Sequence, residues 1–166
     1  MEKWDILDRF GSRTGRTVTK GGELSDGEYH LVVHAWIISS NNGKILIQKR
    51  PEHLEFAPGI WAVAGGSAIH GENSMTAVCR EVKEELGIVI NPVIDPVRYV
   101  NNNSITDIWV VKSDVNLKDV KIQEEEVTAV KWVTNIELKT MIQNGEFYKS
   151  SYKEYYELLS ANICLL

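Results

Sequence analysis

The sequence is short of the features that mark several large classes of protein. Only two of its 166 residues are cysteines, which excludes the disulfide framework of a small secreted domain. No apolar run approaches the length that crosses a membrane, and the first residues lack the basic and apolar regions of a secretory signal. We therefore expect no membrane contact, and the expected location is the cytoplasm.

Positive charge is also scarce. The chain has 18 lysines and arginines against 23 aspartates and glutamates, a net charge of -5, and it has no long basic stripe. This balance argues against a nucleic-acid partner. There is no internal repeat, and a chain of this length can bury a core of its own, so we expect a single domain over residues 1–166.

What the chain does have is a concentration of acidic side chains in residues 66–88, GSAIHGENSMTAVCREVKEELGI. Glu81, Glu84 and Glu85 stand at i, i+3 and i+4, which places their carboxylates on one face of a helix within a single turn. Such a cluster repels itself unless a cation joins it. Mg²⁺ and Mn²⁺ favour oxygen ligands, so the pattern predicts a divalent-metal site.

The opposite side of the same segment is apolar. Aliphatic side chains recur at every fourth residue over 78–86, a stripe typical of an amphipathic helix that packs on a core. Asn73 or Ser74 can cap the start of this helix, and Gly87 can end it in the left-handed conformation. We expect a helix over residues 74–86.

The segment before the helix is predicted to be a short apolar strand, residues 61–64, followed by a loop. Gly65 and Gly66 allow backbone angles that a side chain would forbid, and the carbonyl of either glycine can face a metal. Glu72 can join the acidic cluster from the loop. Arg80 either braces one of these carboxylates or contacts phosphate.

The spacing of these residues resembles the Nudix box, G-x5-E-x7-R-E-U-x-E-E-x-G-U, in which U is aliphatic. Every specified position is filled, by Gly66, Glu72, Arg80, Glu81, Val82, Glu84, Glu85, Gly87 and Ile88. The resemblance implies an α/β fold, the Nudix α/β/α sandwich with a mixed β-sheet. It also implies a Mg²⁺-dependent pyrophosphohydrolase, with Mn²⁺ as an alternative ion. The implied substrate is a small molecule, a nucleoside diphosphate linked to another moiety or a similar diphosphate.

Roles for individual residues follow from the cluster and the resemblance together. The expected metal ligands are Glu81, Glu84, Glu85, Gly66 and Glu72. The expected catalytic residues are Glu84, Glu81, Arg80 and Glu125. Glu125 is the choice from an acidic run, residues 124–126, because Nudix enzymes often take a further carboxylate from a loop near this place; a solvated run is the alternative. The general base stays open, since neighbouring carboxylates titrate as a coupled set.

The remaining predictions concern the strands and the ends of the chain. Strands are expected over residues 30–38, 44–50, 97–100, 105–111 and 127–133, and the Asn-Asn-Gly turn at 41–43 joins the first two as antiparallel neighbours. Lys49 and Arg50 end the second strand, where the resemblance places substrate phosphates; an exposed strand end is the alternative.

A hairpin is predicted in residues 1–22, ahead of a core over 28–135. It either covers a sheet edge or pairs with a second copy to form a homodimer. Helical periodicity over 135–144 and 152–159 predicts C-terminal helices within 136–166.

Two other functions stay open. Residues 30–61 also resemble the type I isopentenyl diphosphate isomerases, which share the fold but move protons at carbon. His30 matches one of their metal-binding histidines, and Asp107 falls near their acid. The isomerase cysteine is absent, however, and Ser67 stands where a histidine ligand is expected. The other alternative is a catalytically inactive nucleotide-binding module.

Overall fold

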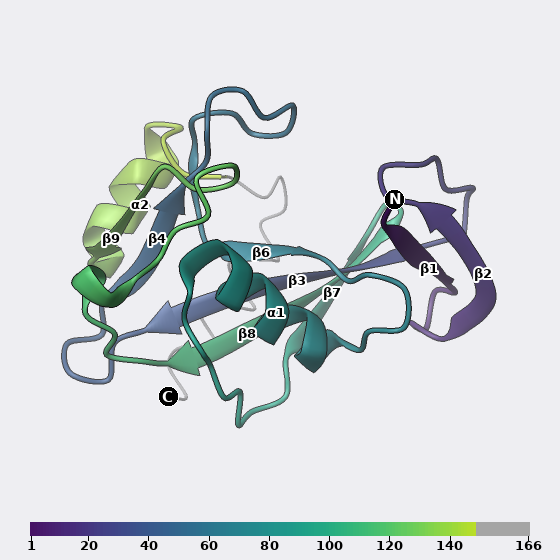
Figure 1. Ribbon diagram of the computed structural model, residues 1–166, viewed down its shortest axis with the longest axis horizontal. Helices are drawn as coiled ribbons and strands as arrows, with labels where there is room; N and C mark the ends of the chain where they lie inside the picture. Colours follow the sequence, from purple (N-terminus) through teal and green to yellow (C-terminus); the bar gives the residue numbers. More distant parts are fainter. Residues whose placement is uncertain (149–166) are drawn as a thin grey trace.

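The apolar run that begins at His30 forms β3 (His30–Ile38), the central strand of a seven-stranded mixed sheet in a structure that describes residues 1–148. The structure is a computed structural model (Figure 1). β8 (Ser104–Lys112) pairs with β3 in parallel along its whole length, and β7 (Val97–Asn101) adds an antiparallel strand to β8. On the other edge of β3, β6 (Ala64–Ser67) runs antiparallel to it.

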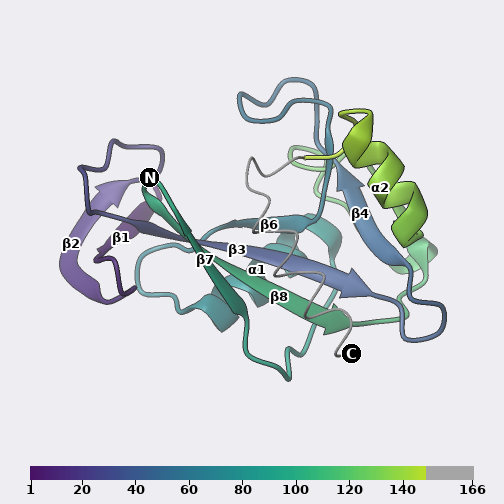
Figure 2. The same ribbon diagram turned by 180° about the vertical axis from the view of Figure 1, so that it is seen from behind.

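β4 (Ile45–Lys49) diverges from β3 after the turn that joins them. The ladder between these two strands contains only the pair Ile38 and Ile45. β9 (Ala129–Val133) pairs with the other edge of β4 along its whole length. β5 (Trp61–Ala62) pairs with Gln48 and Lys49 at the end of β4, and β3 and β4 separate, as Figure 2 shows. The predicted antiparallel neighbours are therefore adjacent only at the turn. The predicted strand over 61–64 is likewise divided, between β5 and β6.

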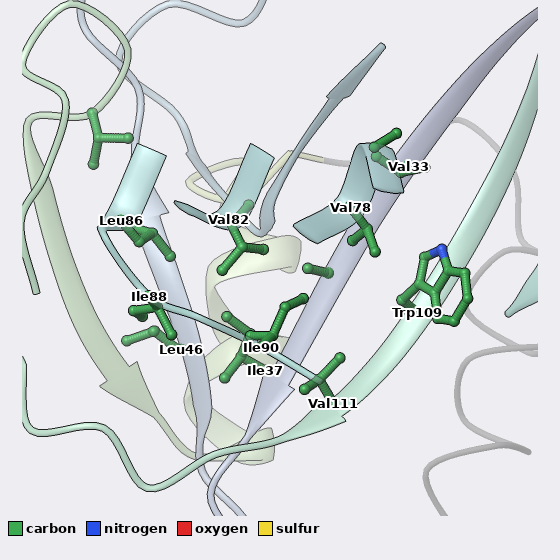
Figure 3. Close-up of a cluster of buried hydrophobic side chains, with 14 of the residues drawn as sticks. Val33, Ile37, Leu46, Val78, Val82, Leu86, Ile88, Ile90, Trp109 and Val111 are labelled. Atoms are coloured by element: carbon green, nitrogen blue, oxygen red, sulfur yellow. The ribbon is translucent and has the colours of Figure 1, made fainter. Parts of the chain in front are cut away.

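α1 (Ser74–Leu86) lies on one face of the sheet and has the bounds that the sequence predicts. Val78, Val82 and Leu86 are buried against strand residues that include Ile37 and Val111 (Figure 3). Burying a side chain of this size contributes about 1.5–3 kcal/mol. The stripe therefore fixes the helix, and the acidic residues it carries, against the sheet.

Both ends of α1 are capped by the sequence itself. The side chain of Asn73 accepts a hydrogen bond from the Thr76 N–H, and the Thr76 hydroxyl accepts one from the Asn73 N–H. Gly87 has a φ of 67° and closes the helix in the left-handed region. The predicted cap and C-terminal glycine are confirmed, with Asn73 rather than Ser74 at the start.

The N-terminal residues form the predicted hairpin, with β1 (Lys3–Leu7) antiparallel to β2 (Arg13–Thr19). It stands at one end of the molecule, away from α2 (Figure 1). Two contacts join it to the start of β3. Leu7 and Tyr29 exchange backbone hydrogen bonds of 2.7 and 3.0 Å, and the ring of Trp4 stacks on His30 at 4.1 Å.

α2 (Asn135–Gln143) covers the second face of the sheet, where Leu138 and Met141 pack beside Trp36 and Phe147. Helices on both faces confirm the α/β/α arrangement. A single turn of 3-10 helix (Leu117–Asp119) precedes β9. The predicted helix over 152–159 lies outside the described residues. No helix within residues 1–148 is long and apolar enough to cross a membrane.

Candidate active site

Arg80 joins the acidic residues of the loop and the helix. Its Nε and Nη2 atoms donate to the two carboxylate oxygens of Glu72 at 2.8 and 2.9 Å. Its Nη1 atom donates to Glu81 at 3.0 Å and to Glu84 at 2.9 Å. These bonds, led by the one to Glu72, raise the pKa of Arg80. Of the two roles predicted for Arg80, the structure shows the brace.

The next turn of the helix carries a carboxylate that Arg80 does not reach. Glu85 is 1% exposed, and its Oε2 atom accepts a hydrogen bond of 2.9 Å from the Gly65 N–H. Its Oε1 atom is buried and has no hydrogen-bond partner within residues 1–148. Burial, and then the negative charge of Glu81, raises the pKa of Glu85 to about 8.

Glu81 is buried as well, and burial raises its pKa despite the opposing charge of Arg80. Glu72 behaves differently. Burial acts against its ionisation, but hydrogen bonds from Arg80 and the Ile69 N–H hold the pKa of Glu72 below its usual value. The site therefore contains one well-stabilised carboxylate and a pair, Glu81 and Glu85, that is costly to keep ionised.

The glycines after β5 are needed for this arrangement. A Cβ atom at Gly66 would lie 2.6 Å from Oε1 of Glu81, closer than any side chain tolerates. A Cβ atom at Gly65 would collide with the carbonyl oxygen of Val33 on β3. The close approach of β6 to β3 therefore requires glycine at position 65, whereas a side chain at position 66 would displace the Glu81 carboxylate.

Sequence reasoning missed two residues at this site. Gln48, in the middle of β4, is 1% exposed, and its side chain lowers the pKa of Glu85. Its signal was a polar residue that directly follows three apolar residues of the strand. Glu126 is the second: its charge raises the pKa of both Glu81 and Glu85.

Glu126 changes the expectation for the acidic run before β9. The sequence favoured Glu125, but that residue is exposed, whereas Glu126 is half-buried and lies in the electrostatic environment of the buried pair. The candidate carboxylate from this loop is accordingly Glu126. Three adjacent glutamates look alike in a sequence, and only the fold distinguishes them.

Lys49 is the last residue of β4, and Arg50 follows it. The Arg50 Nε atom donates to the carbonyl of Phe56 at 3.1 Å, and the Phe56 ring lies 5.8 Å from its guanidinium. The Lys49 carbonyl accepts from the Thr128 N–H at 2.8 Å. Neither side chain bonds to the acidic residues within the described part of the chain. Their predicted contact with phosphates stays a prediction.

The residues shared with the isomerases have structural partners. His30 Nδ1 lies 3.1 Å from the carbonyl oxygen of Asn103, and its ring stacks on Trp4. Asp107 is fully buried and receives two hydrogen bonds of 2.8 Å from Arg98. These contacts give the isomerase alternative no support.

The chemistry of the donor set fits a hard cation, although its ligands are not gathered around one point. No three His, Cys, Asp or Glu side chains among residues 1–148 surround a common metal position. Arg80 holds three of the carboxylates in ion pairs instead. The unpartnered oxygen of Glu85 beside Glu81 is the feature that a divalent ion would satisfy, since all the available donors are oxygens.

Comparison with known proteins identifies the family. A family model described as the NUDIX domain matches residues 28–155. The chain belongs to the Nudix family. An uncharacterized Nudix hydrolase of Listeria monocytogenes is 41% identical to it over 152 residues, which cover 89% of this chain and 88% of that protein. The family predicted from residues 66–88 is thus confirmed, as is the class of enzyme, a hydrolase that acts on acid anhydrides.

Solved structures show the same Nudix fold. A Deinococcus radiodurans protein superimposes with a TM-score of 0.76 at 20% identity and covers 93% of this chain and 96% of its own. A bifunctional NMN adenylyltransferase/ADP ribose pyrophosphatase of Francisella tularensis, complexed with AMP and a Mn ion, gives a TM-score of 0.62 at 20% identity. That match covers 80% of this chain and 42% of the Francisella protein. The resemblance to isopentenyl diphosphate isomerases stays a prediction.

Proposed function

We propose that this Nudix protein is a divalent-metal-dependent hydrolase that cleaves the diphosphate linkage of a nucleoside diphosphate joined to another moiety, or of a similar diphosphate. One observation carries the proposal. Glu81 and Glu85 are buried side by side with raised pKa values, and one oxygen of Glu85 has no partner among the described residues. A fold gains nothing in stability from such a pair, whereas Mg²⁺ or Mn²⁺ binding would use both carboxylates.

The residues that would hold the ion lie on three elements. They are Glu81, Glu84 and Glu85 on α1, Glu72 and the Gly66 carbonyl before it, and Glu126 from the loop before β9. A bound divalent ion supplies positive charge for the diphosphate oxygens and lowers the pKa of a bound water.

The chain's own groups would then handle the proton and the phosphates. A carboxylate whose pKa lies near neutrality is suited to accept a proton from the attacking water, and burial moves Glu81 and Glu85 in that direction. Glu84, held by Arg80 at the exposed edge of the cluster, is the other candidate base. Arg50 and Lys49 are the proposed contacts for substrate phosphates. The AMP and Mn ion bound to the Francisella neighbour support a nucleotide substrate.

The test is a panel of nucleoside diphosphate sugars, dinucleotides, nucleoside triphosphates and prenyl diphosphates, incubated with Mg²⁺, Mn²⁺ or EDTA. We expect release of phosphate or nucleotide from at least one compound, only with a divalent ion. Glu81→Gln and Glu85→Gln should each abolish most of this turnover and retain the fold. Glu23→Gln, an exposed glutamate outside the site, is the matched control.

Three results would contradict the proposal. Full activity in either variant would remove the carboxylates from the reaction. Conversion of isopentenyl diphosphate to its dimethylallyl isomer, without hydrolysis of any compound, would assign the chain to the isomerase class. Saturable nucleotide binding without turnover in either metal would make it a binding module.

A further inference from the structure

The N-terminal hairpin lies outside the residues matched by the family model, yet it contacts the loop that carries Glu72. The Asp5 Oδ2 atom accepts a hydrogen bond of 2.9 Å from the Gly71 N–H, and Oδ1 lies 2.7 Å from Nδ1 of His70. The Lys3 carbonyl accepts from the His70 N–H at 2.8 Å. One carboxylate and one carbonyl of β1 thus hold two consecutive residues of the loop.

Arg13, on β2, also bonds to this loop. Its Nη2 atom donates to the backbone carbonyl of Glu72 at 2.6 Å, while its Nε atom pairs with Asp5 at 3.1 Å. The guanidinium therefore ties the Asp5 carboxylate to the main chain of the residue whose side chain enters the acidic cluster. Burial works against the ionisation of Asp5, but its bonds to Gly71, His70 and Arg13 lower its pKa, so it is charged at neutral pH.

Two further sets of hydrogen bonds connect this loop to the candidate active site. The Glu72 carboxylate receives two hydrogen bonds from Arg80, and Arg80 in turn holds Glu81 and Glu84. The position of the loop thereby sets the position of the Arg80 guanidinium. A displaced loop would displace the guanidinium that orders the helix carboxylates.

The hairpin is fixed on its other side, so it can act as a support. Ile6 and Leu7 are buried, and Leu7 exchanges two backbone hydrogen bonds with Tyr29 next to β3. Between the hairpin and the loop there is a cavity of about 290 Å³, lined in part by Leu7, Arg13, Ile69 and Asn73. Because close packing is incomplete there, the position of the loop depends on directed polar contacts more than on side-chain packing.

The charges at the open end of the hairpin also lie within the field of the site. Glu2 and Lys20 form an ion pair of 2.8 Å. The Lys20 hydrogen bond, and more weakly the charge of Arg80, lowers the pKa of Glu2. The hydrogen bond to Glu2, and more weakly the charge of Glu81, raises the pKa of Lys20.

We propose that the N-terminal hairpin is part of the active site, in which Asp5 and Arg13 are positioning residues that hold the loop of Glu72 and, through Glu72 and Arg80, the carboxylates of α1. The predicted effect of the hairpin on turnover rests on the proposed function, whereas its predicted effect on the position of the loop does not.

The first test measures the loop directly, by hydrogen exchange of the full-length protein at the amides of residues 69–72. Asp5→Ala and Arg13→Ala should each speed this exchange about tenfold or more, since each removes charge-assisted hydrogen bonds to the loop. Arg16→Ala is the matched control, because Arg16 lies on the same strand and pairs with Glu28 instead. Asp5→Asn, which keeps an acceptor for Gly71, covers the case in which the alanine variant does not fold. Unchanged exchange in the Asp5 and Arg13 variants would overturn the proposal.

The second test asks whether the effect travels through Glu72. In Asp5→Ala we expect Mn²⁺ affinity, measured by electron paramagnetic resonance, and kcat on the best compound of the panel to fall about 10- to 100-fold. Arg13→Lys, which retains the positive charge beside Asp5, should keep more of the Mn²⁺ affinity and of kcat than Arg13→Ala does.

A variant that already carries Glu72→Gln should lose little more when Asp5→Ala is added, because both changes act on the same chain of contacts. Wild-type kcat and Mn²⁺ affinity in Asp5→Ala, or fully additive losses, would refute the proposal. If the wild-type protein hydrolyses no compound, the proposed function fails, and hydrogen exchange and Mn²⁺ affinity still decide the role of the hairpin.

Discussion

Replacing Glu85 with glutamine should stabilise the metal-free protein at alkaline pH while it removes turnover. Glutamine keeps an acceptor for the Gly65 N–H and places an uncharged amide at the position of the unpartnered Oε1 atom. The variant therefore retains the packing of the site but removes a buried negative charge beside Glu81. Stability and activity are expected to change in opposite directions.

The sign and size follow from the pKa of the side chain. Glu85 loses its proton near 4.5 in the unfolded chain and at about 8 in the folded protein. Between these values the folded protein holds a proton that the unfolded chain has lost, so the free energy of unfolding falls as pH rises through this window. Each pKa unit corresponds to about 1.4 kcal/mol, which sets an upper limit of about 5 kcal/mol for the whole window.

Urea denaturation in EDTA at pH 5 and pH 8.5 measures this difference. Wild type and Glu85→Gln should unfold at similar urea concentrations at pH 5, and the variant should be more stable by about 2–5 kcal/mol at pH 8.5. Mg²⁺ at pH 8.5 should restore stability to the wild type only. Equal differences at both pH values would refute the reasoning, because the destabilisation would then not come from ionising Glu85.

Three further predictions test the geometry of the site and of the helix that carries it. Gly66→Ala places a Cβ atom 2.6 Å from a Glu81 oxygen, and thermal denaturation should show a loss of about 1–3 kcal/mol together with a loss of turnover. Glu126→Gln should lower kcat about tenfold or more, whereas Glu125→Gln should lower it less than twofold; the reverse order would restore the choice made from the sequence. Asn73→Ala removes the cap of α1 and should cost about 1 kcal/mol in denaturant unfolding without a change in kcat, because within residues 1–148 the Asn73 side chain bonds Thr76 alone.

The helix that carries the acidic residues was predictable because its signals are local. Asn73 and Gly87 mark its ends within the segment itself, and an apolar residue at every fourth position marks its buried face. Once the helix is known, the shared face of its glutamates follows from helical geometry alone. The family was predictable for the same reason, since residues 66–88 specify it over a short span.

The pairing of strands was not predictable in this way. The apolar character of β3 indicates burial, but nothing in its residues shows that β8 is its parallel partner. The turn at 41–43 suggested that β4 would stay beside β3, whereas the two strands form a single pair and β5 bonds Gln48 and Lys49 instead. The same nonlocality hid Gln48 and Glu126, which lie near the acidic face of α1 only because the fold brings β4 and the loop before β9 there.

The candidate active site contains more carboxylates than its one arginine can pair. One guanidinium, Arg80, serves three carboxylates, and Glu85 and Glu126 have no part in those ion pairs. Burial raises the pKa of Glu81 and Glu85, and the neighbouring carboxylates repel one another. A restraint on Arg80 therefore limits the movement by which these carboxylates could separate. The loop supplies that restraint through Glu72, and the hairpin contacts the loop. If the proposed role of the hairpin holds, a segment outside the family match determines how closely the carboxylates proposed to bind the metal are held together.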